Sequence, residues 1–327
     1  MHTGEPLRRG PRVFGFLLAA LLFLLGLDLT VAAQEEPAEL GLREEVAVGW
    51  VHVPVVVRSR GGYVPDLEQE DFRLFVDGRP VPIAEFEAGS DAPVTVVFLQ
   101  DLSGSMGIAG KLDESREAIR FFLEAARPGD RYALASFANG ELAVEVPFTT
   151  DLQPIHEAIG LWEPYGTTAL HDAVFWLPDI TLGADFAKRA AILITDGVDN
   201  ASAIAPVTAR QRVRGAELPV YVLGLATGSP DAVDSEGRKL YRYADLLDLL
   251  ASLSGGRYFA VVGPYELKEA CVAIHDDLRH QYVLGFATTG TAQPGPHQLR
   301  VEVARRADQD LTVTHRKSYR GGAPDVR

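Results

Sequence analysis

Short apolar runs alternate along the middle of the chain with longer stretches whose apolar residues recur every three or four positions. The runs predict strands that are covered on both faces, and the longer stretches predict amphipathic helices. The strands are expected at residues 94–99, 132–137, 190–194, 220–225 and 257–261, and the helices at residues 112–126, 170–177, 206–213, 243–253 and 265–279. This alternation predicts the α/β class: a doubly wound, mainly parallel sheet with helices on both sides.

One segment of this region has a different period. Residues 142–148 alternate between apolar and outward-facing positions, and Pro147 occupies an outward position. Proline within a strand is typical of a sheet edge, and the Asn139-Gly140 pair before it is a typical hairpin turn. We therefore expect one antiparallel edge strand in the otherwise parallel sheet.

The two flanks of the α/β region also show alternation. Residues 72–76 lead into an Asp77-Gly78 turn, and residues 282–286, 299–303 and 311–313 follow the last helix. Each flank is of marginal size for a core of its own. We expect residues 44–90 and 281–320 to pack together as one small β module, with the α/β domain of residues 92–280 inserted between them.

The first 33 residues have the three-part pattern of a secretory signal peptide. Arg8, Arg9 and Arg12 precede an apolar run over residues 13–27, and Val31-Ala32-Ala33 supplies the small residues of a cleavage site. An uncleaved anchor is the alternative, but the run is short of the roughly 20 residues that a membrane span needs. Cleavage after Ala33 predicts an exported protein, periplasmic or extracellular, without a stable membrane span.

Composition narrows the class of partner. The chain has 31 Lys and Arg against 45 Asp and Glu, a formal charge of −14, which becomes −15 without residues 1–33. So acidic a chain lacks the surplus of cations that nucleic-acid binding requires, and this class is excluded. Its one cysteine, Cys271, excludes an intrachain disulfide framework and a Cys-rich zinc site. Cys271 lies in an apolar helical stripe, which predicts a core position.

Oxygen-bearing residues gather at three strand–helix junctions. These segments are Asp101-Leu102-Ser103-Gly104-Ser105, Gly166-Thr167-Thr168 and Thr195-Asp196-Gly197. Taken singly, each is readily explained as a turn or a helix cap. In an open α/β sheet, however, the carboxyl ends of the strands share one rim, where ligands bind. Two carboxylates and three hydroxyls suit Mg²⁺ or Mn²⁺, and the predicted metal-binding residues are Asp101, Ser103, Ser105, Thr168 and Asp196.

These segments, together with residues 98–106 and 192–197 around them, resemble the signature segments of the von Willebrand factor type A domain, whose sheet is Rossmann-like. The resemblance covers residues 92–280, and residues 251–257 also resemble a segment of bacterial members. The flanks more loosely resemble those of exported bacterial VWFA-related proteins of the acidobacterial type. The resemblance implies a metal-ion-dependent adhesion site, in which Ser103 and Ser105 would bind Mg²⁺ directly. Thr168, Asp101 and Asp196 would bind it directly or through water.

The same resemblance implies how a partner would bind. An open coordination position on the metal would accept an acidic side chain of a protein or peptide partner. Asp199 and Asn200 are expected to shape the loop rather than to bind the metal. The expected function is therefore non-enzymatic, divalent-dependent protein binding, and the oligomeric state is left open.

Two other classes are weighed against this one. A phosphohydrolase of the haloacid dehalogenase type would use Asp101 as nucleophile, but it needs a second aspartate as general acid where this chain has Ser103. The second alternative is a structural or scaffold component of the cell envelope, in which the metal only stabilises the fold.

Overall fold

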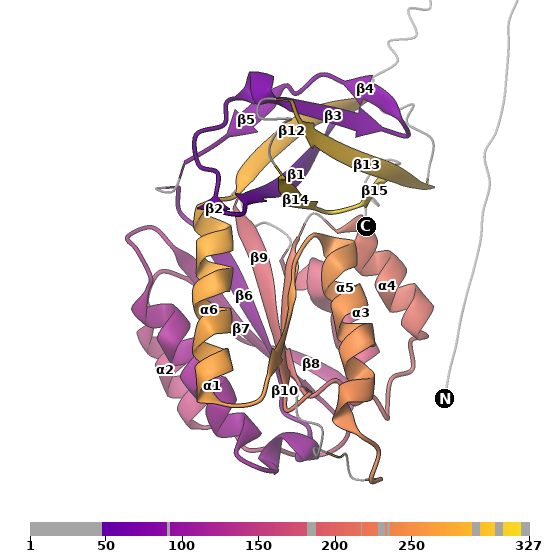
Figure 1. Cartoon of the computed structure of the whole chain (residues 1–327). Coiled ribbons are helices and arrows are strands. Elements are labelled where there is room, and N and C mark those ends of the chain that lie inside the picture. The colour runs from indigo at the N-terminus through magenta and orange to yellow at the C-terminus, as the bar shows by residue number, and fades with distance from the viewer. Residues whose placement is uncertain are drawn as a thin grey trace, which may run out of the picture. The chain divides into compact units, whose positions relative to one another are not determined.

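The computed structural model describes residues 48–89, 92–181, 188–216, 218–227, 233, 236–289, 295–304 and 310–321 (Figure 1). The predicted signal peptide, residues 1–33, lies outside the described residues. Within them, no helix combines the length and the apolar character needed to cross a membrane.

A six-stranded sheet forms the centre of the α/β region. Its strands lie in the order β11-β10-β9-β6-β7-β8, and every neighbouring pair is parallel except β7 and β8. The strands are β6 (Thr95–Asp101), β7 (Arg131–Ala138), β8 (Glu141–Thr149), β9 (Arg189–Thr195), β10 (Val220–Leu225) and β11 (Tyr258–Val261). The predicted fold class, with its antiparallel edge strand after the Asn139-Gly140 turn, is confirmed.

Helices cover both faces of this sheet, as Figure 1 shows. The apolar core on one face includes side chains of α1, α2 and α6, and the core on the other face includes side chains of α3, α4 and α5. The helices are α1 (Lys111–Glu124), α2 (Gln153–Gly160), α3 (Leu170–Ile180), α4 (Pro206–Gly215), α5 (Ala244–Ser254) and α6 (Pro264–Arg279). Short 3₁₀ helices are η1 (Gln69–Asp71), η2 (Gly104–Gly107) and η3 (Leu240–Tyr243).

Cys271 is a core residue, as predicted. Its side chain is buried on α6. Burial raises the pKa of this thiol to about 12, which keeps it protonated and unreactive at neutral pH. The structure gives it a packing role.

Strands from the two flanks of the chain pair with each other. β1 pairs with β12 in a sheet of order β14-β1-β12-β5, with β2 added beside β1, and β13 pairs with β3 in a sheet of order β15-β13-β3-β4. The strands are β1 (Val48–Ser59), β2 (Gly62–Tyr63), β3 (Phe72–Val76), β4 (Arg79–Val81), β5 (Glu85–Glu87), β12 (Tyr282–Thr289), β13 (Gly295–Val303), β14 (Thr312–His315) and β15 (Ser318–Gly321). They enclose one apolar cluster, and we call this unit the β module.

Polar contacts tie the β module to the α/β domain. Asp277 near the end of α6 is buried and accepts hydrogen bonds from Arg58 and Tyr63 of the β module. Lys188, which precedes β9, donates to the backbone carbonyl of Gly89. Arg316 donates to the carbonyl of Ala216, which lies before β10. The last two of these contacts reach residues that precede parallel strands, so they lie at the amino ends of the sheet.

His315 at the end of β14 makes the stability of the fold depend on pH. Its Nδ1 lies 2.6 Å from the carbonyl oxygen of Arg316, and the Val301 N–H points to its Nε2 at 3.4 Å. This pairing fits a neutral ring with the proton on Nδ1. Burial, together with the charge of Lys317, lowers the pKa of His315 to about 4.

We expect the folded protein to lose stability on acidification because of this ring. Between pH 6.5 and pH 4 the unfolded chain binds a proton on His315 that the folded chain does not bind, so the free energy of unfolding falls as the pH falls. The contribution between pH 7 and pH 5 is about 2 kcal/mol. Urea unfolding of the wild type and of His315→Gln at both pH values measures it. Equal losses in the two proteins would contradict this account of His315.

Candidate functional site

The candidate site lies where the strand order of the sheet reverses. From β6 the chain continues to β7 on one side, whereas β9 pairs with β6 on the other side. Such a reversal opens a crevice beyond the carboxyl ends of the two strands. Asp101 is the last residue of β6, and Asp196 directly follows β9. The topology therefore places the two predicted carboxylates on the two sides of this crevice.

The first loop, residues 101–105, folds around Asp101. Its Oδ1 accepts the Ser103 N–H at 2.9 Å, and its Oδ2 accepts the Thr195 hydroxyl at 2.7 Å from the end of β9. The η2 helix begins directly after Ser103 and brings the Ser103 and Ser105 hydroxyl oxygens to 3.2 Å from each other. One carboxylate and two hydroxyls thus stand together on one loop, and the bond from Thr195 joins this loop to the third.

The second loop, residues 166–168, is fixed between the other two. The Gly104 N–H donates to the carbonyl of Gly166 at 3.1 Å. On its other side, Thr168 donates its N–H to Oδ1 of Asn200 at 2.9 Å, and its carbonyl accepts the N–H groups of Asn200 and Ala201. Hydrogen bonds therefore connect the first loop to the second loop and to the third loop, residues 195–197, and they connect the second loop to residues 200 and 201, which follow the third.

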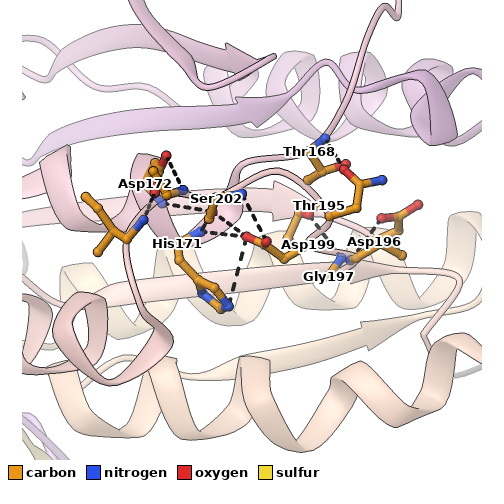
Figure 2. Close-up of polar contacts among 12 residues, drawn as sticks. Thr168, His171, Asp172, Thr195, Asp196, Gly197, Asp199 and Ser202 are labelled. Carbon is orange, nitrogen blue, oxygen red and sulfur yellow. Dashed lines mark hydrogen bonds and ion pairs between the residues drawn. The ribbon is translucent and has the colours of Figure 1, made fainter.

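The Thr168 side chain does not cap the helix that follows it. Ala169 is the capping position of α3 and makes no side-chain capping bond. The N–H of His171 instead donates to Oδ2 of Asp199 and to the Ser202 hydroxyl, each at 3.0 Å, and Figure 2 shows Asp199 in contact with Ser202 and His171. Asp199 and Asn200 thus shape the loop and the start of the helix, as the sequence analysis expects of them.

Asn139 braces the second loop, which the sequence analysis does not foresee. This residue belongs to the β7–β8 turn and has a positive φ of 53°. Its Oδ1 accepts the Thr167 N–H at 2.8 Å, and its own N–H donates to the Thr167 carbonyl at 2.8 Å. The Asn-Gly signal is sufficient to predict the turn, but only the fold shows what the turn contacts.

Burial and charge distinguish this site from an ordinary turn cluster. Asp101 and Asp196 are both 0% exposed, and Ser103 and Thr168 are buried beside them. Burial and the neighbouring charge of Asp196 raise the pKa of Asp101 to about 7, although hydrogen bonds from Ser103 and Thr195 lower it. Lys111, another residue missed in the sequence analysis, places its Nζ 2.6 Å from Oδ2 of Asp196.

The donor atoms fit a small, hard dication. Carboxylate and hydroxyl oxygens are ligands of Mg²⁺ and Mn²⁺. Adjacent ligands of an octahedral ion bound at about 2.1 Å are separated by about 3 Å, and the Ser103 and Ser105 hydroxyl oxygens are 3.2 Å apart. Among the described residues, no group of three His, Cys, Asp or Glu side chains offers a different metal site.

The protein thus has a mainly parallel α/β sheet with an oxygen-rich site at the point where the strand order reverses, between β6 and β9. Residues 96–198 match the family model of the von Willebrand factor type A domain. The matched residues include all three loops. Residues 96–198 of the chain thus form a region of the von Willebrand factor type A domain family.

Known proteins show low-identity similarity. An uncharacterised protein of Borreliella burgdorferi is 24% identical over 191 residues, which are 53% of this chain and 54% of that protein, so the match spans about half of that relative. An aerotolerance-related membrane protein from Bacteroides fragilis is 22% identical, with a TM-score of 0.46 over 57% of this chain and 98% of that one. The von Willebrand factor domain of the type V pili tip protein Mfa5 from Porphyromonas gingivalis is 15% identical, with a TM-score of 0.45 over 57% and 94%.

The contact between Gly166 and Asn139 leads us to expect that a methyl group added at Gly166 destabilises the fold. Gly166 has φ of +69°, and a Cβ there would lie 2.0 Å from Oδ1 of Asn139, the atom that holds Thr167. Gly78 has a similar φ of +78° but open space around it. We expect Gly78→Ala to cost about 1 kcal/mol of unfolding free energy, the cost of a left-handed backbone for alanine. Gly166→Ala should cost about 1–3 kcal/mol more because Asn139 is displaced.

Urea unfolding of the two glycine variants and the wild type measures the difference. Both substitutions add the same methyl group in the same backbone region, so Gly78→Ala measures the backbone cost and the difference between the two variants measures the steric cost. Equal stabilities for the two variants would show that Asn139 does not brace the second loop.

Proposed function

We propose that this protein is a non-enzymatic interaction protein that binds Mg²⁺, or Mn²⁺, through Asp101, Ser103, Ser105, Thr168 and Asp196. The observation that carries the proposal is the burial of two carboxylates beside three hydroxyl-bearing residues at the reversal point of the sheet. A buried pair of like charges is unfavourable unless a cation neutralises it. A bound dication removes this cost, and the loops that bring the donors together are fixed by hydrogen bonds to each other.

The partner group follows from the chemistry of such a site. A dication held by neutral hydroxyls and few carboxylates retains Lewis acidity and an affinity for a further oxygen anion. We propose that an aspartate or glutamate side chain of a protein or peptide partner supplies it. Ile108 and Tyr165, which belong to the first-loop and second-loop regions, are 55% and 48% exposed. They offer apolar contact around the acidic group, and the negative chain favours a partner whose other contacts are apolar or basic.

Metal binding is tested by thermal and chemical unfolding with and without Mg²⁺. At about 100 times its dissociation constant, a ligand of the folded state alone adds about 2.7 kcal/mol to the unfolding free energy. We expect this gain in the wild type, its reversal by EDTA and its loss in Asp101→Ala. Asp113→Ala is the matched control, because Asp113 is exposed on α1 and lies outside the three loops. Retention of the full gain in Asp101→Ala would refute the site.

Partner binding is tested by affinity capture from the envelope and medium of the producing cell. We expect a protein that the wild type retains with Mg²⁺ and releases with EDTA, and that Asp101→Ala fails to retain. The predicted signal peptide is the reason for choosing this fraction. The structural alternative predicts a different pattern: EDTA lowers the melting temperature, but every captured protein stays bound.

A further inference from the structure

A buried lysine belongs to the site but to none of the three oxygen-bearing segments. Lys111 is the first residue of α1 and is only 4% exposed. Its Nζ donates to Oδ2 of Asp196 at 2.6 Å, across 85 residues of sequence. A lysine so deeply buried requires a specific charge partner, and Asp196 is that partner.

The backbone before Lys111 directs this side chain inward. Ala109 and Gly110 both have positive φ, 57° and 77°, so two successive residues are left-handed directly before the helix. A left-handed alanine is energetically unfavourable and persists only where the surroundings fix it. The Ser115 hydroxyl donates to the Lys111 carbonyl at 3.0 Å and holds the first turn from the other side. The lysine is therefore placed at the site by the local fold.

The charges of these buried groups do not balance. In their ionised forms, Asp101 and Asp196 carry two negative charges, and the Lys111 ammonium carries one positive charge. Two carboxylates alone would neutralise a dication completely. With Lys111 included, a site that holds a dication has a net charge of +1.

We propose that Lys111 is a positioning residue that weakens the binding of the dication and makes the loaded site select an anionic group. The inference depends on the proposed function. The ammonium donates to Oδ2 of Asp196, whereas Oδ1 accepts a 3.3 Å hydrogen bond from the Val198 N–H and would be the oxygen that binds the metal or its water. The uncompensated positive charge then attracts a carboxylate to the open coordination position of the metal. The charge of Lys111 thus both lowers the affinity for the metal and strengthens the preference for an acidic group.

The inference is tested with Mn²⁺ alone as the probe, by calorimetric titration of the purified protein at constant ionic strength. Removal of a unit charge that lies 2.6 Å from an oxygen of the proposed ligand Asp196 should change the affinity for the ion by roughly tenfold or more. We expect Lys111→Met to bind Mn²⁺ at least tenfold more tightly than the wild type. Lys111→Gln, which keeps a hydrogen-bond donor without the charge, should do the same if the methionine variant folds poorly. Lys268→Met is the matched control, because it makes the same charge change on the exposed face of α6.

A second titration, with acetate replacing chloride, measures the preference for an acid. Acetate should tighten Mn²⁺ binding by the wild type at least twofold, and by a smaller factor in Lys111→Met. If the wild type binds Mn²⁺ and both Lys111 variants bind it no more tightly, the role of Lys111 is overturned and the proposed metal site stands. If none of the proteins binds Mn²⁺, the proposed function fails, and this inference fails with it.

Discussion

Two carboxylates buried at the ends of adjacent strands are the constraint on which the rest of the site depends. Asp101 and Asp196 have no exposed surface, and the charge of Asp196 adds to burial in raising the pKa of Asp101. The strand order brings the two carboxylates together, because Asp101 ends β6, Asp196 follows β9, and these two strands pair in parallel. The Thr195 hydroxyl, the Ser103 N–H and the Lys111 ammonium are the groups with which the chain compensates the two charges. These three groups lie where they do because two buried carboxylates need hydrogen-bond donors or cations nearby.

At the amino ends of the same sheet, a buried carboxylate is instead fully paired with a cation. Asp130, which precedes β7, pairs with the Arg279 guanidinium through both of its oxygens. Burial raises the pKa of Asp130, but Arg279 and the backbone N–H groups of Val94 and Arg127 lower it below its ordinary value overall. A fully matched pair of this kind is structural, and it adjoins the contacts to the β module. At the carboxyl ends, the buried carboxylates Asp101 and Asp196 outnumber the one buried cation, Lys111, and the proposed cation site depends on this difference.

The parts of this structure that the sequence predicts are those set by local pattern. Continuous apolar runs identify the parallel strands of the central sheet, and alternation identifies β8. Helical spacing identifies five of the six α-helices found in the described residues. The sixth, α2, has only eight residues and buries only Ile155 and Ile159, too few to show a period. α4 ends at Gly215, two residues beyond the end that the sequence pattern predicts. β1 was not separately predicted, because Pro54 interrupts a run that otherwise alternates toward the core of the β module.

The parts that the sequence does not predict are long-range contacts of residues with ordinary local roles. Because the carboxyl ends of parallel strands lie at one edge of a sheet, the sequence is sufficient to predict the five oxygen-bearing residues as candidate metal ligands. It does not reveal that Asn139 holds the second loop, because an Asn-Gly turn explains that residue by itself. It does not reveal Lys111 either, since a lysine in the first turn of an amphipathic helix is usually solvated. Only the approach of α1 to the end of β9 gives this lysine a role.

Asp101 and Ser103 also bear on the choice between binding and catalysis. A carboxylate whose pKa is about 7 has a proton affinity suited to a general base at neutral pH. Each oxygen of this carboxylate accepts one bond from the protein, one from the Ser103 N–H and one from the Thr195 hydroxyl, and these bonds fix its orientation. A carboxylate has about four acceptor positions, so a metal or its water can still be bound. Because both bonds hold the carboxylate in place and favour its charged form, Asp101 is suited to be a fixed ligand of the proposed metal site. The argument against a phosphohydrolase comes from Ser103, which stands where such an enzyme needs a second aspartate as general acid.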